Sequence, residues 1–193
     1  MAQPTTKPAS PSGAGVSVVS WPPELFAMQA NTLMAIYAEA MGYPAAAAGY
    51  RADTARRHIA NTGFDTRVAL NENGVVLGFA YGYTTRPGQW WHDLVYRAVA
   101  PSLRAQWLTD AFELSEMHVR PQAQGLGIGR RMLVDLCAGL PQSAVLLSTP
   151  DADTRAFRLY RSLGFVDLAR RYLFPGDARP FAVLGARLPL PVS

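Results

Sequence analysis

The stretch Gln122–Leu133, QAQGLGIGRRML, places three glycines within five positions and then continues into a basic, leucine-rich segment. A glycine-rich loop that opens a helix is typical of an anion site, because the first helical turn has unpaired N–H groups and the helix dipole favours negative charge. Glycine also lacks the Cβ atom that would keep a pyrophosphate away from the backbone. The stretch therefore predicts a site for a phosphate-containing ligand, with Arg130 and Arg131 adding positive charge at the same end.

The spacing of Gly125, Gly127 and Gly129 differs from two common phosphate-binding motifs. A dinucleotide fold has G-x-G-x-x-G directly after a first strand and an acidic residue about 20 positions later. A P-loop has Gly-Lys followed by Ser or Thr, a tripeptide that this chain lacks. The glycines alone therefore leave the identity of the ligand open.

The cysteine and histidine content argues against a metal site. A single cysteine, Cys137, excludes an internal disulfide and a cysteine-based zinc site, and its apolar neighbours favour a core position over a catalytic one. The three histidines, His58, His92 and His118, share no metal-ligand spacing. We expect no metal.

The composition indicates one globular domain. The chain has 193 residues, of which 49% are hydrophobic, and a formal net charge of +4. This mildly basic balance suits an anionic ligand such as a nucleotide, but no run of five like charges is present, so we expect no nucleic-acid partner.

The ends of the chain suggest how it is organised. Residues 1–15, rich in Pro, Ser, Thr, Ala and Gly, predict a disordered tail, and residues 16–193 predict a single domain. The N-terminus lacks the hydrophobic segment of a secretory signal, and no apolar run approaches the length of a membrane span. We expect a cytoplasmic protein that does not interact with membranes.

The hydrophobic pattern predicts helices and strands around one sheet. We expect strands at 15–21, in a hairpin over 66–85 turned at Asn73-Gly74, and at 112–119, 143–149, 165–174 and 179–188, with Pro175-Gly176 between the last two. We expect helices at 24–42, at 49–63 with Gly63 as its end, from the glycine stretch to about Leu140, and at 151–164 with Gly164 as its end. This order implies an α/β fold, a mixed sheet with helices on both faces.

A tryptophan-rich segment between the hairpin and the 112–119 strand allows two interpretations. It contains Trp90, Trp91 and Trp107 and has a helical pattern interrupted by Pro101. One interpretation is an extra helical hairpin packed on the core. The other is an aromatic wall over a substrate cleft, because tryptophan offers a large contact area at low entropy cost.

Two further motifs narrow the interpretation of the glycine stretch. MHVRPQAQGLGIGRRML resembles the acetyl-CoA-binding segment of the GNAT superfamily of N-acetyltransferases, whose Gln/Arg-x-x-Gly-x-Gly/Ala signature is matched by Gln124, Gly127 and Gly129. About 30 residues later, TRAFRLYRSLGFV is similar to the second motif of that family, with Tyr160 before the Leu-Gly-Phe turn. The resemblance covers about residues 67–168 and implies a single GNAT-like domain with a mixed, mostly antiparallel sheet.

The resemblance also implies how acetyl-CoA is held. The strand end would pair through its backbone with the pantetheine arm, and the backbone of the glycine loop would hold the pyrophosphate. Tyr160 would stand near the sulfur and protonate the departing thiolate, a role open to a phenol within hydrogen-bond reach. The cofactor-binding residues implied are Met117, His118, Val119, Gln124, Gly125, Leu126, Gly127, Ile128, Gly129, Arg130 and Asp153.

The base that takes the proton of the acceptor amine is left open among three residues. Glu113 and Glu116 are three positions apart, so on a regular strand they face opposite sides and at most one reaches the cleft unless a bulge intervenes. We favour Glu116, which lies nearer the expected opening between the strands, although an ion-paired glutamate fits the sequence equally well. His118 is the third candidate, with packing as its alternative role.

At Asp153 the chain departs from the family, many members of which have asparagine seven residues before the tyrosine. Asp153 is still expected to cap the helix.

The sequence thus predicts an enzyme that transfers acetyl from acetyl-CoA to a primary amine by direct attack in a ternary complex. We expect a small-molecule acceptor; the alternatives are a protein N-terminus or lysine and, from another class, a non-catalytic acyl-CoA sensor. The acceptor, the acyl chain and the oligomeric state stay open, although the C-terminal strands offer an edge for a homodimer.

Overall fold

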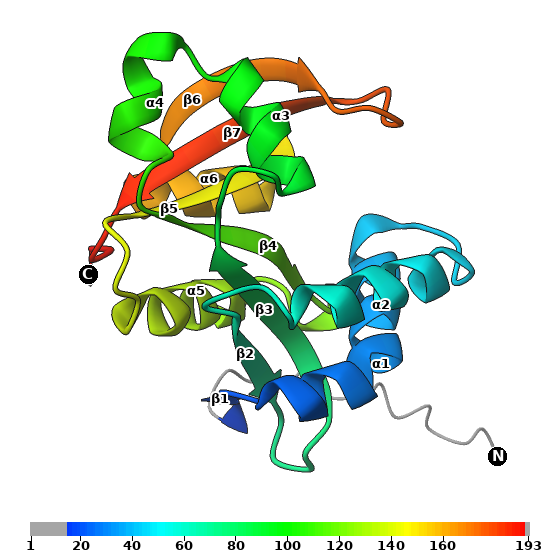
Figure 1. Ribbon diagram of the computed structural model, residues 1–193. Helices are drawn as coiled ribbons and strands as arrows, with labels where there is room; N and C mark the ends of the chain where they lie inside the picture. The colour runs from blue at the N-terminus through cyan, green and yellow to red at the C-terminus, as the bar shows by residue number, and fades with distance from the viewer. Residues whose placement is uncertain (1–14, 192–193) are drawn as a thin grey trace, which may run out of the picture.

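The computed structural model describes residues 15–191, so the expected tail, residues 1–15, lies almost entirely outside the described residues. Seven strands and six α-helices alternate along this part of the chain (Figure 1). The strands are β1 (Ser17–Val19), β2 (Asp65–Leu70), β3 (Val76–Thr84), β4 (Ala111–Val119), β5 (Ala144–Pro150), β6 (Val166–Leu173) and β7 (Pro180–Arg187). The helices are α1 (Pro23–Met41), α2 (Ala47–His58), α3 (Trp90–Ala98), α4 (Pro101–Trp107), α5 (Ile128–Ala138) and α6 (Arg155–Ser162), and a short 3-10 helix, η2 (Pro121–Ala123), precedes α5.

The strands form one sheet in the order β1-β2-β3-β4-β5-β7-β6. Every neighbouring pair is antiparallel except β4 and β5. This confirms the expected mixed, mostly antiparallel sheet. Of the C-terminal strands, β6 is at the edge of the sheet and β7 lies between β5 and β6.

Alternate residues of the strands pack on opposite faces of the sheet, as strand geometry requires. Ala80 on β3 and Val145 on β5 face α5 and α6. Phe79 and Leu146, one position away on the same strands, face the other layer, in which α1 and α2 cover one half and α3 and α4 the other. Helices therefore cover both faces, as expected.

The local turn signals mark most boundaries correctly. Gly42, with φ 67°, ends α1, and Gly164, with φ 81°, follows α6. The hairpin forms between β2 and β3, but its connection covers residues 71–75 and is longer than a two-residue turn. The Asn71 side chain holds this connection by accepting bonds from the N–H groups of Asn73 and Val75.

The predicted end of the second helix is wrong. We expected it to continue to Gly63, whereas α2 ends at His58. Turn bonds from the N–H groups of Ala60 and Asn61 to carbonyls of the last helical turn replace the helix there. This earlier end allows Phe64 to pack its ring edge-on against Phe26, with the centroids 5.1 Å apart.

The tryptophan-rich segment forms the expected helical hairpin, α3 and α4. Val95 and Trp107 from these helices belong to a buried cluster with Leu146 and Val183 of the sheet. The segment is thus a structural addition that covers the β5-β7-β6 half of the sheet.

Candidate active site

A gap between two parallel strands creates the main cavity. β4 and β5 pair only where Ala111–Glu113 lies beside Ala144–Leu146, and beyond this point they share no ladder. A cavity of about 1480 Å³ opens there. Pockets for a single small ligand usually measure about 300–1,000 Å³, so this cavity is larger than one such ligand needs.

The glycine loop forms one wall of the cavity. Gly125 and Gly127 have φ angles of 83° and 76°, in the left-handed region that favours glycine. A Cβ atom at either position would meet nothing within 4 Å, so the glycines are required by backbone conformation and not by crowding. Gly127 is the N-cap of α5 and provides no side chain to bond the first N–H groups of this eleven-residue helix.

Most of the predicted cofactor residues meet at this wall. The cavity is lined by Met117, His118, Val119, Gln124, Gly125, Gly127, Ile128, Gly129 and Arg130. The Gln124 side chain donates to the Val119 carbonyl at 3.0 Å and so ties the loop to the end of β4. Leu126 is different, because it packs against the hydrophobic core and is absent from the cavity wall.

The expected cap of the last helix is wrong by one residue. Thr154, not Asp153, is the N-cap of α6, and its hydroxyl accepts a bond from the Phe157 N–H at 3.0 Å. Asp153 is exposed, lies outside the cavity wall and pairs with Arg158 at 2.6 Å. Thr154 has extended backbone angles and directly precedes the first helical residue, Arg155, so its hydroxyl lies beside the unpaired N–H groups of the first turn. The assignment of Asp153 to the cofactor stays a prediction that this placement does not support.

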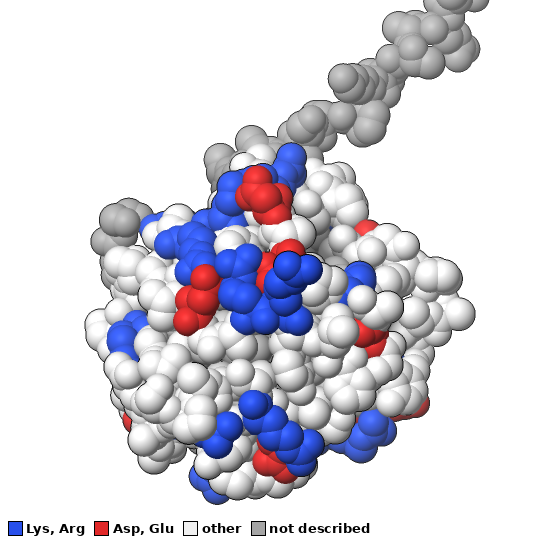
Figure 2. All heavy atoms as spheres, turned by 90° about the horizontal axis from the view of Figure 1, so that it is seen from above, with Lys and Arg blue, Asp and Glu red and all other residues white. Residues whose placement is uncertain are grey.

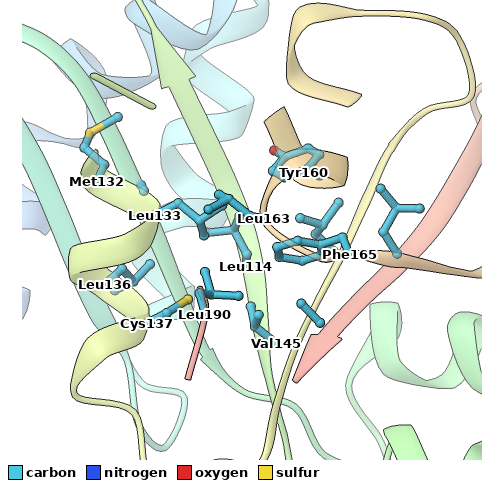
Figure 3. Packing of buried hydrophobic residues seen from close by; sticks show 14 of the residues in the cluster. Leu114, Met132, Leu133, Leu136, Cys137, Val145, Tyr160, Leu163, Phe165 and Leu190 are labelled. Atoms are coloured by element: carbon cyan, nitrogen blue, oxygen red, sulfur yellow. The ribbon is translucent and has the colours of Figure 1, made fainter. Parts of the chain in front are cut away.

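Tyr160 lies where the core meets the cavity. It belongs to α6, is buried, and packs its ring 5.4 Å from that of Phe165 (Figure 3). It also lines the cavity. Burial raises the pKa of its phenol, and the charge of Glu116 adds to this effect, so Tyr160 retains its proton at neutral pH.

A β-bulge brings Glu113 and Glu116 to the same side of β4. Tyr81 of β3 lies opposite Glu116, but the next residue, Gly82, lies opposite Leu114, which leaves Ser115 as the extra residue. The expectation for a regular strand, with the glutamates on opposite faces, therefore does not apply. Both glutamates line the cavity.

Glu113 is the less compensated of the two carboxyls. It is 3% exposed, and its Oε1 accepts a bond from the Tyr83 hydroxyl at 3.0 Å. Its Oε2 is buried without a hydrogen-bond partner among the described residues. Burial raises the pKa of Glu113 to about 8, with a smaller contribution from the charge of Glu116. Such a carboxyl takes up and releases a proton near neutral pH.

Glu116 is held as an anion by two partners. It accepts a bond from His118 Nε2 at 2.7 Å and pairs with Arg51 of α2 at 3.2 Å. Burial alone would raise the pKa of Glu116, but the bond and charge of His118 and the charge of Arg51 outweigh burial and lower it. His118 also packs on Tyr37, with ring centroids 5.0 Å apart, so it is both a packing residue and a partner of Glu116.

Sequence reasoning missed Arg51 and Tyr83, although both line the cavity. Tyr83 was detectable in principle, because it shares the face of β3 that also presents Tyr81. Arg51 gives no local signal, because its partner Glu116 is 65 positions away in the sequence.

Another part of the cavity wall, called the far side below, comes from α2, α3 and the connection between β6 and β7. Trp90 and Trp91 line it, as the aromatic-wall interpretation requires. Trp107 does not; it is buried in α4 beneath Arg187, whose guanidinium lies 4.1 Å from the ring centroid. The interpretation as a helical hairpin packed on the core is thus confirmed, and the aromatic wall over a substrate cleft stays a prediction that the positions of Trp90 and Trp91 fit.

Basic side chains gather on the face seen from above, with acidic side chains among and beside them (Figure 2). Separately, Arg161 of α6 pairs with Asp167 of β6, and Arg170 of β6 pairs with Asp151. In the part of the chain that the structure describes, no helix is long and apolar enough to cross a membrane.

Comparison with known proteins relates both the sequence and the fold to acetyltransferases. Residues 63–167 match a family model described as "Acetyltransferase (GNAT) domain". The chain is 37% identical over 204 aligned residues to a GCN5-like protein acetyltransferase of Mycobacterium tuberculosis, with 91% of this chain and 99% of that protein covered.

Solved structures share the fold at low sequence identity. The ribosomal-protein-S18-alanine N-acetyltransferase of Escherichia coli matches with a TM-score of 0.61 at 16% identity, covering 90% of this chain and 94% of that one. A Salmonella typhimurium protein assigned as an acetyltransferase, whose structure contains acetyl-CoA, matches with a TM-score of 0.61 at 17% identity and covers 92% and 96%.

Proposed function

The chain belongs to the GNAT family of acetyltransferases, and we propose that it transfers the acetyl group of acetyl-CoA to the nitrogen of a primary amine by direct attack. One observation carries this proposal. The gap between β4 and β5 brings the glycine loop, the buried carboxyl of Glu113 and the phenol of Tyr160 to a single cavity. These are the three elements that acyl transfer from a phosphate-containing thioester to an amine requires.

The residues at the cavity wall fit acetyl-CoA. Beyond Glu113, the β5-facing edge of β4 has no ladder partner among the described residues. Apart from the Val119 carbonyl, which accepts a bond from Gln124, the backbone at Met117–Val119 is therefore available to the amide groups of a pantetheine arm. The uncapped start of α5 and the left-handed loop before it suit a pyrophosphate. Acetyl-CoA would supply the activated acetyl group, and the protein would supply binding, orientation and proton transfer.

We propose Glu113 as the base. A primary ammonium must lose a proton before its nitrogen can attack, and the pKa of Glu113, about 8, suits a base that works near neutral pH. Its unpartnered Oε2 has free capacity for the proton, directly or through a water. Glu116, favoured from the sequence, is engaged by Arg51 and His118, and its lowered pKa makes it a weaker base.

We propose Tyr160 as the acid. As the nitrogen–carbon bond forms and the carbon–sulfur bond breaks, the sulfur leaves as a thiolate that requires a proton. The phenol of Tyr160 lines the cavity and is protonated at neutral pH. On the way from ammonium to amide the nitrogen loses two protons. Glu113 takes the first before the attack and later releases it to solvent. The second leaves the nitrogen as the amide forms and replaces the proton that Tyr160 gives to the sulfur, so that one proton is released overall.

The acceptor class has support from two sides. The name of the Mycobacterium tuberculosis relative favours a protein amine such as a lysine side chain. The aromatic far side of the cavity favours the small, partly apolar amine expected from the sequence. Both acceptors present a primary amine and fit the same chemistry.

Titration calorimetry with acetyl-CoA, free CoA and NAD tests the cofactor assignment. We expect micromolar binding of acetyl-CoA and none of NAD. Thiol release with a panel of amines then tests turnover. If acetyl-CoA does not bind, the assignment of the cavity to acetyl-CoA is wrong.

A further inference from the structure

Two exposed aromatic side chains face the same cavity from different helices. Trp90 of α3 is 63% exposed and Tyr50 of α2 is 77% exposed, and both line the cavity. The other large apolar side chains exposed in the described residues, among them Met28 and Tyr96, lie outside it. Large exposed apolar groups beside a reaction site indicate a surface that a ligand covers.

Contacts with neighbouring side chains hold the Trp90 side of this surface. The Trp90 ring lies 6.0 Å from that of Phe174, which packs edge-on against Phe181 at 5.4 Å. The neighbouring Trp91 donates its indole N–H to Ser148 Oγ on β5 at 3.1 Å, which fixes the start of α3 beside the gap between the strands. The aromatic shelf, defined here as Trp90, Phe174 and Phe181, is therefore preformed.

The arginine side chains on this side of the cavity disfavour an acceptor with a second positively charged group. Arg51 is paired with Glu116, and Arg179 is paired with Asp177. Arg57 also lines the cavity, and its guanidinium bonds the Thr54 hydroxyl and no carboxylate among the described residues. A second ammonium on the acceptor would meet this uncompensated positive charge, which disfavours polyamines.

We propose that the aromatic shelf is an acceptor subsite for a flat apolar ring, so that the preferred acceptor is an arylalkylamine, a primary amine joined to an aromatic ring by a short linker. This inference rests on the proposed function, because the amine itself would reach Glu113, which lines the same cavity. The ring would lie on Trp90, the exposed member of the shelf, while Phe174, which is only 8% exposed, supports the Trp90 ring from the core side.

Binding of a non-reacting analogue tests the subsite without turnover. 2-Phenylethanol has the ring and linker but no amine, so its affinity, measured by NMR titration, is independent of catalysis. We expect Trp90→Ala to weaken this binding about tenfold and Trp90→Phe to restore most of it, because a phenyl ring replaces part of the contact area. Tyr96→Ala is the matched control, since Tyr96 is an exposed aromatic residue of the same helix outside the cavity wall.

Kinetics with two amines then tests the preference. With 2-phenylethylamine, Trp90→Ala should lower kcat/KM about tenfold, whereas with n-propylamine it should change kcat/KM less than about twofold. Equal effects on the two amines, or a wild-type preference for a lysine peptide over 2-phenylethylamine, would overturn the inference. If the analogue binds in a Trp90-dependent way but no amine is acetylated, the subsite stands and the proposed function fails.

Discussion

Glu113 and Glu116 lie on the same side of β4, although three positions separate them, because the bulge at Ser115 shifts the register opposite β3. The two carboxyls nevertheless have opposite electrostatic surroundings. Glu113 has one hydrogen-bond donor, Tyr83, whereas Glu116 has His118 and Arg51. One strand irregularity thus places a protonatable carboxyl and a fixed anion beside the same cavity.

Glu113 is expected to make stability fall as pH rises. Its folded-state pKa, about 8, lies above its ordinary value near 4.5, so the folded protein retains a proton that the unfolded chain has lost. The resulting stabilisation is complete below about pH 4.5 and is lost as pH rises through about 8. Glu113→Gln removes this dependence and should be more stable than the wild type above pH 8, by on the order of a few kcal/mol. Urea denaturation at pH 6 and pH 9 measures the free energy of unfolding of both proteins. If this free energy changes equally with pH in the wild type and in Glu113→Gln, the prediction is contradicted.

The charge of Glu116 is expected to tune the base. Glu116→Gln removes the anion but leaves Arg51 and His118 in place, so ionisation of Glu113 becomes easier. The acidic limb of the pH profile of kcat/KM should move down by roughly one pH unit. Asp53→Asn, which removes an exposed carboxylate of α2 paired with Arg56, is the control and should leave the limb in place. An unchanged limb in Glu116→Gln would show that its charge does not reach the base.

Tyr160→Phe separates acid catalysis from binding. The substitution keeps the buried ring beside Phe165 and removes only the hydroxyl. We expect kcat to fall by roughly 100-fold, at the lower end of the effects of general acids, while the Kd for acetyl-CoA stays unchanged. Thiol release and calorimetry measure the two quantities on the same preparation. Normal turnover in this variant would exclude the acid role.

Where the signal is local, the structure places the residues where the sequence predicts them, although the roles of the site residues stay predictions. The glycines at 125 and 127, Tyr160 before its Leu-Gly-Phe turn and the break between α3 and α4 at Pro101 each depend on a few adjacent residues. Sequence reasoning failed where the outcome depends on a competition or on distant contacts. Asp153 and Thr154 are both good helix caps, and only the backbone path decides between them. The bulge at Ser115 depends on pairing with another strand, which no pattern within β4 reveals.

Gly127 offers a direct test of the phosphate loop, because its backbone angle disfavours other residues although the space around it is open. A Cβ atom there meets no protein atom within 4 Å, so in the free protein Gly127→Ala adds no clash and only disfavours φ 76°. Alanine in the left-handed region costs about 1–2 kcal/mol, and if the loop relaxes to avoid that cost, acetyl-CoA should bind roughly tenfold more weakly. Gly139→Ala, at the other end of α5, also gains a Cβ in open space but has φ −106°, so it should leave affinity unchanged. Calorimetry measures the affinity of both variants for acetyl-CoA. Equal affinities of Gly127→Ala and Gly139→Ala would mean that the left-handed loop does not hold the pyrophosphate.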